Sequence, residues 1–133
     1  MSQPRNPIIV ALDVPNLASA LTLVDQLAPA VGAFKVGKEL FVATGPDIVR
    51  RIRDTGASVF LDLKFHDIPN TVAKAIEAAV QLDVQMLTIH TSGGLAMMQA
   101  AQKAAVDAAL RAGKSQPLVL GVTVLTKIGR AHV

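Results

Sequence analysis

The stretch FLDLKFHDIPN, residues 60–70, contains the change from strand to helix that decides the fold. Its first residues are apolar and typical of a buried strand, whereas Pro69 is favoured in the first turn of a helix. Between these two signals lie Asp62, Lys64 and Asp67, although the chain is 51% hydrophobic and only 17% charged. Charge concentrated at the end of a buried strand indicates either a salt bridge at a sheet margin or a site for chemistry.

The same succession of strand and helix recurs along the chain. Five short apolar runs rich in β-branched residues predict strands at residues 7–14, 33–41, 58–65, 85–91 and 117–125. Apolar residues at helical spacing occupy the four intervals, where Asn16 can cap the first helix and Gly113 can end the last. This strict alternation predicts an α/β fold with a parallel sheet.

Two parallel α/β architectures fit this order: a closed barrel and an open, doubly wound sheet. No G-x-G-x-x-G follows the first predicted strand, which disfavours a dinucleotide-binding doubly wound fold. A closed barrel of eight units needs roughly 200 residues or more, so this chain would supply only about four and a half units.

The last residues, KIGRAHV at 127–133, continue no helical or strand pattern. The codons ATC GGA AGA GCA CAC GTC, which begin a widely used sequencing adapter, would encode residues 128–133. We therefore expect residues 1–126 to be the N-terminal part of one domain and residues 127–133 to be a non-native read-through tail.

The composition narrows the classes of function. The 13 basic residues against 10 acidic ones are scattered, and aromatic residues make up only 3%, so we expect no nucleic-acid partner. The chain has no cysteine, which excludes disulfides and thiolate metal sites and fits the cytoplasm. The N-terminus has no signal-peptide pattern, and no apolar run reaches the roughly 18 residues of a membrane helix. We expect a soluble, cytoplasmic protein without a membrane partner.

Polar residues gather where the predicted strands end. Because side chains alternate along a strand, Asp62 and Lys64 should point the same way, roughly 6–7 Å apart. Asp67 lies beyond the strand, where the loop can turn it back toward the same space. If the strands are neighbours, Asp13 and Lys35 complete an array of carboxylates and ammonium groups.

Such an array suits the removal of a carboxylate. The fixed negative charge destabilises a substrate carboxylate held beside it, and loss of carbon dioxide leaves a carbanion. An ammonium can stabilise that carbanion and then protonate it, with no metal or organic cofactor. An ordinary salt bridge explains the same spacing and remains the alternative at this point.

Four other features have simpler explanations. We expect His66 to pack in its loop and His90 to serve a structural purpose. Met97 and Met98 suit the core. Gly93 and its neighbour could hold a phosphate or simply begin a helix.

The motif DLKFHDIPNT, residues 62–71, carries the pattern D-x-K-x-x-D and resembles the orotidine 5'-phosphate decarboxylase family in its bacterial form. Four further matches occur in the same order. They are ALD at 11–13, FKVGKELF at 34–41, HTSGG at 90–94 and VTVLT at 122–126. The resemblance covers nearly all of residues 7–126.

The resemblance implies a (β/α)8 TIM barrel and a homodimer that converts orotidine 5'-phosphate to UMP, in pyrimidine biosynthesis, without a cofactor. It implies that Lys64 donates the proton and that Asp62 presses on the substrate carboxylate. Asp67 would reach the partner's site, with Ile68 and Thr71 beside it. Asp13 and Lys35 would contact the ribose hydroxyls, and Thr126 would contact the base. The residues expected to contact the substrate are therefore Asp13, Lys35, Asp62, Lys64, Asp67, Ile68, Thr71 and Thr126.

Two alternatives remain. The family binds phosphate through a later arginine and loops that this chain does not contain, and Lys127 stands where the family often has serine. The polypeptide as written is therefore expected to be an inactive truncated fragment that aggregates or stays partly unfolded. The other alternative is a magnesium-dependent sugar-phosphate decarboxylase or synthase of the same superfamily, against which Lys35 argues, because those relatives have an acidic residue there.

Overall fold

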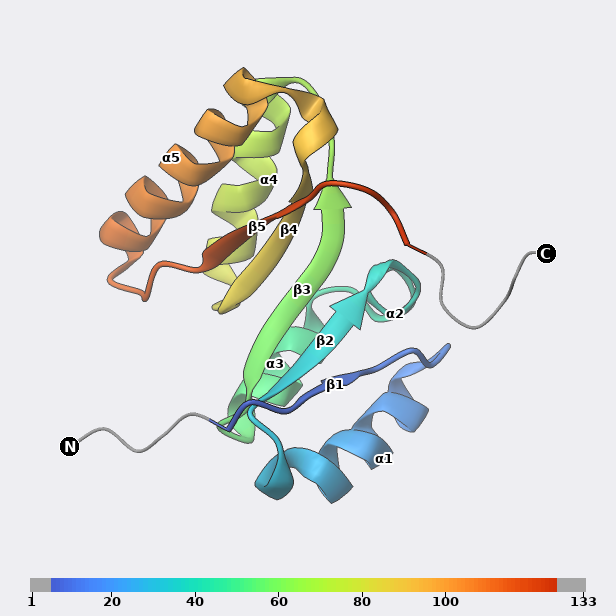
Figure 1. The fold of residues 1–133 in the computed structure, drawn as a ribbon. Helices are drawn as coiled ribbons and strands as arrows, with labels where there is room; N and C mark the ends of the chain where they lie inside the picture. The colour runs from blue at the N-terminus through green and yellow to red at the C-terminus, as the bar shows by residue number, and fades with distance from the viewer. Residues whose placement is uncertain (1–5, 127–133) are drawn as a thin grey trace.

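Five parallel strands form one sheet in the order in which they occur along the chain. A computed structural model describes residues 6–126 (Figure 1). The strands are β1 (Ile9–Ala11), β2 (Ala33–Gly37), β3 (Ser58–Phe65), β4 (Met86–His90) and β5 (Leu118–Val122). The order never reverses, whereas a doubly wound sheet reverses at its switch point. The sheet is thus the wall of part of a (β/α)8 barrel, which confirms the predicted fold class.

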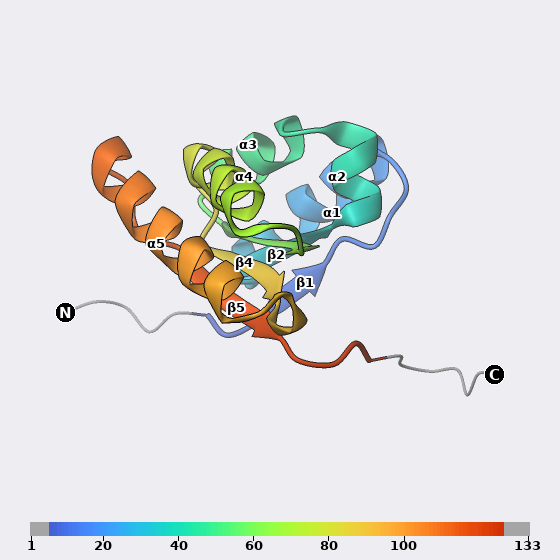
Figure 2. The same cartoon turned by 90° about the horizontal axis from the view of Figure 1, so that it is seen from above.

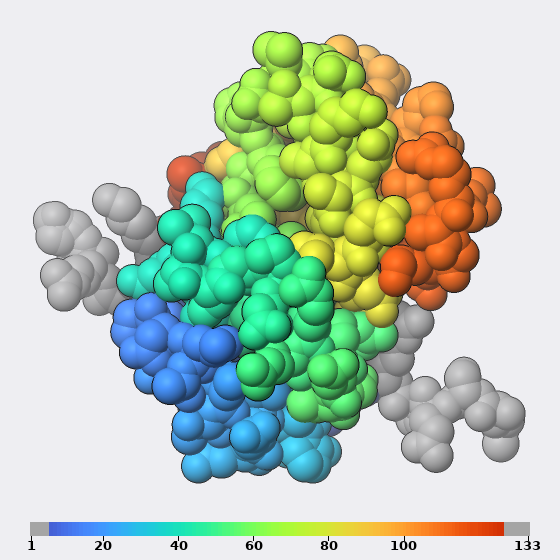
Figure 3. Space-filling model, turned by 180° about the vertical axis from the view of Figure 1, so that it is seen from behind, coloured from blue at the N-terminus to red at the C-terminus, as the bar shows by residue number. Residues whose placement is uncertain are grey.

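The helices all cover the same face of this sheet. They are α1 (Leu17–Leu27), α2 (Lys38–Thr44), α3 (Asp47–Asp54), α4 (Pro69–Gln81) and α5 (Leu95–Ala112), with short 3-10 turns η1 at Ala28–Ala30 and η2 at Thr91–Gly93. Figure 2 shows the helices on one side of the strands, and Figure 3 shows the surface that they form behind the sheet. None of the helices within residues 6–126 is long and apolar enough to cross a lipid bilayer.

The core lies between the helices and the outer face of the sheet. Alternate strand residues point into it, so Phe34, Val59 and Leu87 are fully buried. Ile52 from α3 and Ile76 from α4 are buried against that face. Burial of this layer explains why the strand sequences are apolar at every second position and tolerate charge at the others.

Local signals start and stop the helices as the sequence predicts. The Asn16 side chain accepts a hydrogen bond from the Ser19 amide at 2.9 Å and caps α1. Pro69 lies in the first turn of α4, where its missing N–H costs no helical hydrogen bond. Gly113 adopts the left-handed conformation that ends α5. Met97 is fully buried, as expected for a core residue.

The prediction of one strand over residues 33–41 is wrong after Gly37. Residues 38–44 form α2 instead, with Glu39 in the first turn, where an acidic side chain favours a helix start. The helix buries Leu40 in the core. The first predicted strand, 7–14, is also shorter than expected, since β1 covers only Ile9–Ala11; at its amino end, the Ile8 amide donates to the Asn6 side chain and not to a neighbouring strand. The proposed tail at 127–133 lies outside the described residues.

No helix covers the inner face of the sheet (Figure 2), and exposed apolar residues lie on its two outer strands. Ile9 on β1 is 44% exposed, and Leu118 on β5, the other outer strand, is 59% exposed. Exposed apolar surface of this kind promotes association.

We predict that the 133-residue chain, expressed alone, self-associates through this inner face. Leu118→Lys should reduce the associated fraction, because a charge on the inner face opposes apolar contact between copies. Leu110→Lys, at an exposed position on α5, is the matched control and should change association little. Light scattering and sedimentation measure the effect. A monodisperse monomer with one cooperative thermal transition would contradict the prediction.

Candidate functional site

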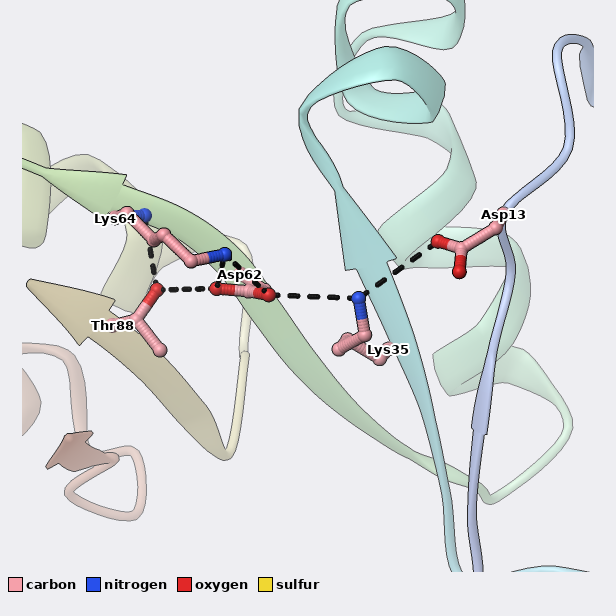
Figure 4. A network of polar contacts seen from close by, with 5 residues as sticks. All are labelled: Asp13, Lys35, Asp62, Lys64 and Thr88. Atoms are coloured by element: carbon pink, nitrogen blue, oxygen red, sulfur yellow. Dashed lines mark hydrogen bonds and ion pairs between the residues drawn. The ribbon is translucent and has the colours of Figure 1, made fainter. Parts of the chain in front are cut away.

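A continuous line of opposite charges crosses the carboxyl ends of β1, β2 and β3. The Lys35 Nζ lies 3.8 Å from an Asp13 carboxylate oxygen and 3.5 Å from an Asp62 oxygen. The Lys64 Nζ lies 2.9 Å from the same Asp62 oxygen. Figure 4 shows the two ammonium groups approaching the Asp62 carboxylate from different directions. The structure thus brings together Asp13, Lys35, Asp62 and Lys64, four of the five members of the predicted array.

Parallel pairing without reversal explains this convergence. Ala11 pairs with Lys35 across β1 and β2, and Gly37 pairs with Asp62 across β2 and β3. The three strands therefore end at one rim, and residues far apart in the sequence meet there.

Asp62 is the centre of the array. Its side chain is only 12% exposed, and it also accepts a 2.8 Å hydrogen bond from the Thr88 hydroxyl. Burial by itself raises the pKa of this carboxyl, but the hydrogen bonds from Lys64 and Thr88 and the charges of the two lysines outweigh it and lower the pKa. Asp62 therefore stays ionised in a place where an isolated carboxylate would be unfavourable.

The backbone at Lys64 departs from regular strand geometry. From the pair Leu61–Leu87 to the pair Phe65–Ile89, β3 advances four residues while β4 advances two, which marks a bulge. Lys64 has φ +50°, in the left-handed region that residues with a Cβ seldom adopt. The bulge, and not simple strand alternation, turns Lys64 so that its ammonium meets Asp62.

Thr88 was not singled out by the sequence analysis. It is 4% exposed and is the one buried polar or charged residue in the described part of the chain. Its Oγ1 accepts the Lys64 amide hydrogen at 2.9 Å and donates to Asp62. A hydroxyl at the middle of the apolar run MLTIH was the available signal, because a lone polar residue in a buried strand needs a partner.

A hollow of about 400 Å³ opens beside the array. Its polar lining comes from Asp62, Lys64, Thr88 and Thr126, and its apolar lining comes from Phe60, Val122, Val124 and Leu125. The structure therefore places Thr126 at the same hollow as the lysine and the aspartate. Apolar walls with a few convergent polar groups are typical of a small-molecule site.

Asp67, Ile68 and Thr71 do not enter this hollow within the chain. All three are exposed, and the Asp67 carboxylate accepts a 2.7 Å hydrogen bond from the Ile68 amide. Among the residues described, Asp67 makes no ion pair, so the expectation that the loop turns it back toward Lys64 within the same subunit is not met. Its expected contact with a second subunit stays a prediction.

The remaining candidates, His66, His90 and Gly93, do not line this hollow. The His66 and His90 rings lie 5.4 Å apart at a tilt, and His66 is exposed. A Cβ on Gly93 would collide with the end of the Met97 side chain, which would have to move to make room. Within residues 6–126, no three His, Asp or Glu side chains are grouped to hold a metal ion.

A second hollow, about 740 Å³, lies at the amino ends of the strands. It is lined by residues such as Ser58, Gln85 and Leu118, and no acidic, basic or histidine side chain lines it. Site chemistry is therefore concentrated at the carboxyl rim, as it is in barrel enzymes.

The fold and the site together define a (β/α)8-barrel protein whose charged site lies at the carboxyl ends of its strands. More particularly, the chain belongs to the Orotidine 5'-phosphate decarboxylase / HUMPS family, whose family model matches residues 6–133.

Three relatives illustrate the match. The chain is 52% identical over 126 residues to orotidine 5'-phosphate decarboxylase of Moorella thermoacetica, an alignment that covers 95% of this chain and 50% of that protein. The crystal structure of the Lactobacillus acidophilus decarboxylase matches with a TM-score of 0.77 at 38% identity, over 93% of this chain and 55% of that one. The Methanocaldococcus jannaschii enzyme complexed with the inhibitor BMP matches with a TM-score of 0.71 at 29% identity, over 90% and 52%. The chain spans about half the length of the curated relatives it matches.

We predict that Lys64→Met raises the pKa of Asp62. The variant removes a hydrogen bond and a positive charge that favour the carboxylate, while the burial that opposes ionisation remains. Carboxyl carbon NMR titration measures the change. Because the folded-state pKa is lowered, Asp62 contributes stability above its unfolded pKa, and that contribution is lost as the pH falls through the folded value.

Lys74→Met is the control for this titration, because Lys74 pairs with Glu77 on α4 and is remote from the array. It should leave the Asp62 titration in place. An unchanged Asp62 pKa in Lys64→Met would show that Lys64 does not hold the carboxylate in solution.

Proposed function

We propose that the gene product, meaning the protein translated from the complete reading frame that encodes this chain, decarboxylates orotidine 5'-phosphate to UMP. The observation that carries the proposal is the Lys64 ammonium, held 2.9 Å from a partly buried, ionised Asp62 at the edge of a hollow on the carboxyl rim. Membership of the family supports the same substrate.

The proposed reaction needs only these two charges at the reacting centre. Asp62 lies beside the substrate carboxylate and destabilises it by like charge. The bond between the pyrimidine carbon and the carboxyl carbon breaks, carbon dioxide leaves, and the electron pair stays on the ring carbon. Lys64 stabilises that negative charge, donates its proton to the carbon and regains a proton from water.

The other array residues have supporting roles in this proposal. Lys35, between Asp13 and Asp62, keeps the array charged and, with Asp13, contacts the ribose hydroxyls. Thr126, at the hollow, contacts the base. Asp67, Ile68 and Thr71 are exposed beyond β3 and would complete the site of a second subunit in a homodimer. The cysteine-free composition supports a cytoplasmic location.

A magnesium-dependent reaction of the same superfamily fits the array less well. The Lys35 ammonium already lies between the carboxylates of Asp13 and Asp62, where a divalent cation would need them. Two positive charges at that point repel each other, and Mg²⁺ prefers oxygen ligands. The decarboxylase proposal therefore includes no cofactor.

The first test is the Lys64→Ala variant of the gene product, assayed with orotidine 5'-phosphate. We expect turnover to fall by about 10³-fold or more, because both proton donation and charge stabilisation are lost. The affinity for UMP, measured by calorimetry, should change far less. Lys74→Ala on α4 is the matched control and should keep wild-type turnover.

Two results would oppose the proposal. A loss of only about tenfold in Lys64→Ala would remove that residue as the proton donor. Loss of wild-type turnover in EDTA would favour the magnesium-dependent alternative.

The second test asks which subunit Asp67 serves. Mixing Asp67→Ala with Lys64→Ala should restore activity, because a hybrid dimer has one site with an intact Lys64 and a partner Asp67. If subunits exchange at random, about a quarter of all active sites in the mixture should be intact. Mixing Asp62→Ala with Lys64→Ala is the control and should restore nothing, since those two residues pair within one chain. Absence of recovery in the first mixture would mean that Asp67 serves its own subunit.

A further inference from the structure

The two groups at the proposed reacting centre share one buried neighbour. Thr88 on β4 donates its hydroxyl hydrogen to Asp62 at 2.8 Å and accepts the Lys64 backbone amide at 2.9 Å (Figure 4). Thr88 is the most buried polar residue in the described part of the chain, with 4% of its surface exposed. One hydroxyl therefore connects the side chain of one charged residue to the backbone of the other.

The hydroxyl has no freedom to exchange these roles. A backbone amide can only donate and an ionised carboxylate can only accept, so the Thr88 oxygen must accept from Lys64 and its hydrogen must point at Asp62. The lowered pKa of Asp62 keeps that carboxylate an acceptor. The orientation of the hydroxyl is thus determined by the array itself.

The contact at Lys64 also maintains an unusual backbone. Asp62, Leu63 and Lys64 bulge out opposite Thr88, and Lys64 has φ +50°. In a regular ladder the amide of a strand residue would donate to a backbone carbonyl of the neighbouring strand. Here the Thr88 side chain accepts it instead, so the bulge leaves no buried amide without a partner.

We propose that Thr88 is a positioning residue that sets the direction of the Lys64 ammonium and the Asp62 carboxylate toward the substrate. The inference rests on the proposed decarboxylase function and deepens it. Without the hydroxyl, the Lys64 amide loses its acceptor and Asp62 loses one of its hydrogen bonds. Both groups would then relax from the geometry that the reaction needs.

The kinetic test compares Thr88→Val with Thr88→Ser in the gene product. Valine keeps the volume but removes the hydroxyl, whereas serine keeps the hydroxyl. We expect kcat to fall by about 10²-fold in Thr88→Val, with KM changed little, and Thr88→Ser to stay within about tenfold of wild type. If Thr88→Val does not fold, Thr88→Ala removes the same hydroxyl.

Thr55→Val is the matched control. The Thr55 hydroxyl also donates one hydrogen bond, to the Ile52 carbonyl, and accepts one, from the Ala57 amide. Thr55 precedes β3, however, and so lies at the opposite end of that strand from the array. It should leave kcat unchanged. Equal losses of kcat in Thr88→Val and Thr88→Ser would show that a retained hydroxyl does not preserve turnover and would overturn the proposal.

A second readout does not depend on turnover. Carboxyl NMR should show a higher Asp62 pKa in Thr88→Val than in wild type, because a hydrogen bond to the ionised form is lost, and the Lys64 amide resonance should shift. Thr88→Ser should preserve both. If the wild-type gene product does not decarboxylate orotidine 5'-phosphate, the proposed function fails, yet these signals still decide whether Thr88 holds the pair. An unchanged Asp62 pKa and Lys64 amide in Thr88→Val would overturn the positioning role.

Discussion

The site depends on one partly buried carboxylate that stays ionised. Burial of Asp62 favours its neutral form, and the opposing stabilisation comes from two ammonium groups and one hydroxyl. Each of these partners belongs to a different place in the chain: Lys35 on β2, Lys64 on the same strand as Asp62, and Thr88 on β4. Removing any one of these partners would raise the pKa of Asp62 and make its ionised form less stable. The array therefore holds together three neighbouring strands as well as a reactive pair.

The sheet topology makes that arrangement possible. Parallel strands in unreversed order all end at one rim, so side chains at their carboxyl ends are neighbours without any special loop. The helices bury the outer face, which leaves the inner face free to carry polar residues near the rim and apolar ones farther down. The core thus lies on the outer face of the strands and the site on the inner face of the same strands. A residue at the rim can therefore be substituted without disturbing the packing of the core.

The bulge in β3 has an energetic cost that its contacts can offset. A residue with a Cβ in a sparsely populated backbone region costs of order 1–3 kcal/mol. A hydrogen bond that involves a charged group contributes about 1.5–3 kcal/mol. Lys64 gains such a bond from its ammonium to Asp62 and a further one from its amide to Thr88. The two terms are of similar size, so the strained conformation is supported by the groups that it brings together.

The sequence by itself determined the alternation of strands and helices, the helix starts at Asn16 and Pro69, and the charged segment at the end of β3, because these follow from local periodicity and turn chemistry. It also predicted that Asp13, Lys35, Asp62 and Lys64 meet, since parallel strands bring their ends to one rim. Only the tertiary structure decided that β2 ends at Gly37, that Asp67 is exposed and bonded to the Ile68 amide, and that Thr88 joins the pair. The physical reason is that these outcomes depend on strand register and on the bulge opposite Thr88, and register is set by packing across the sheet and not by the spacing of residues along one strand.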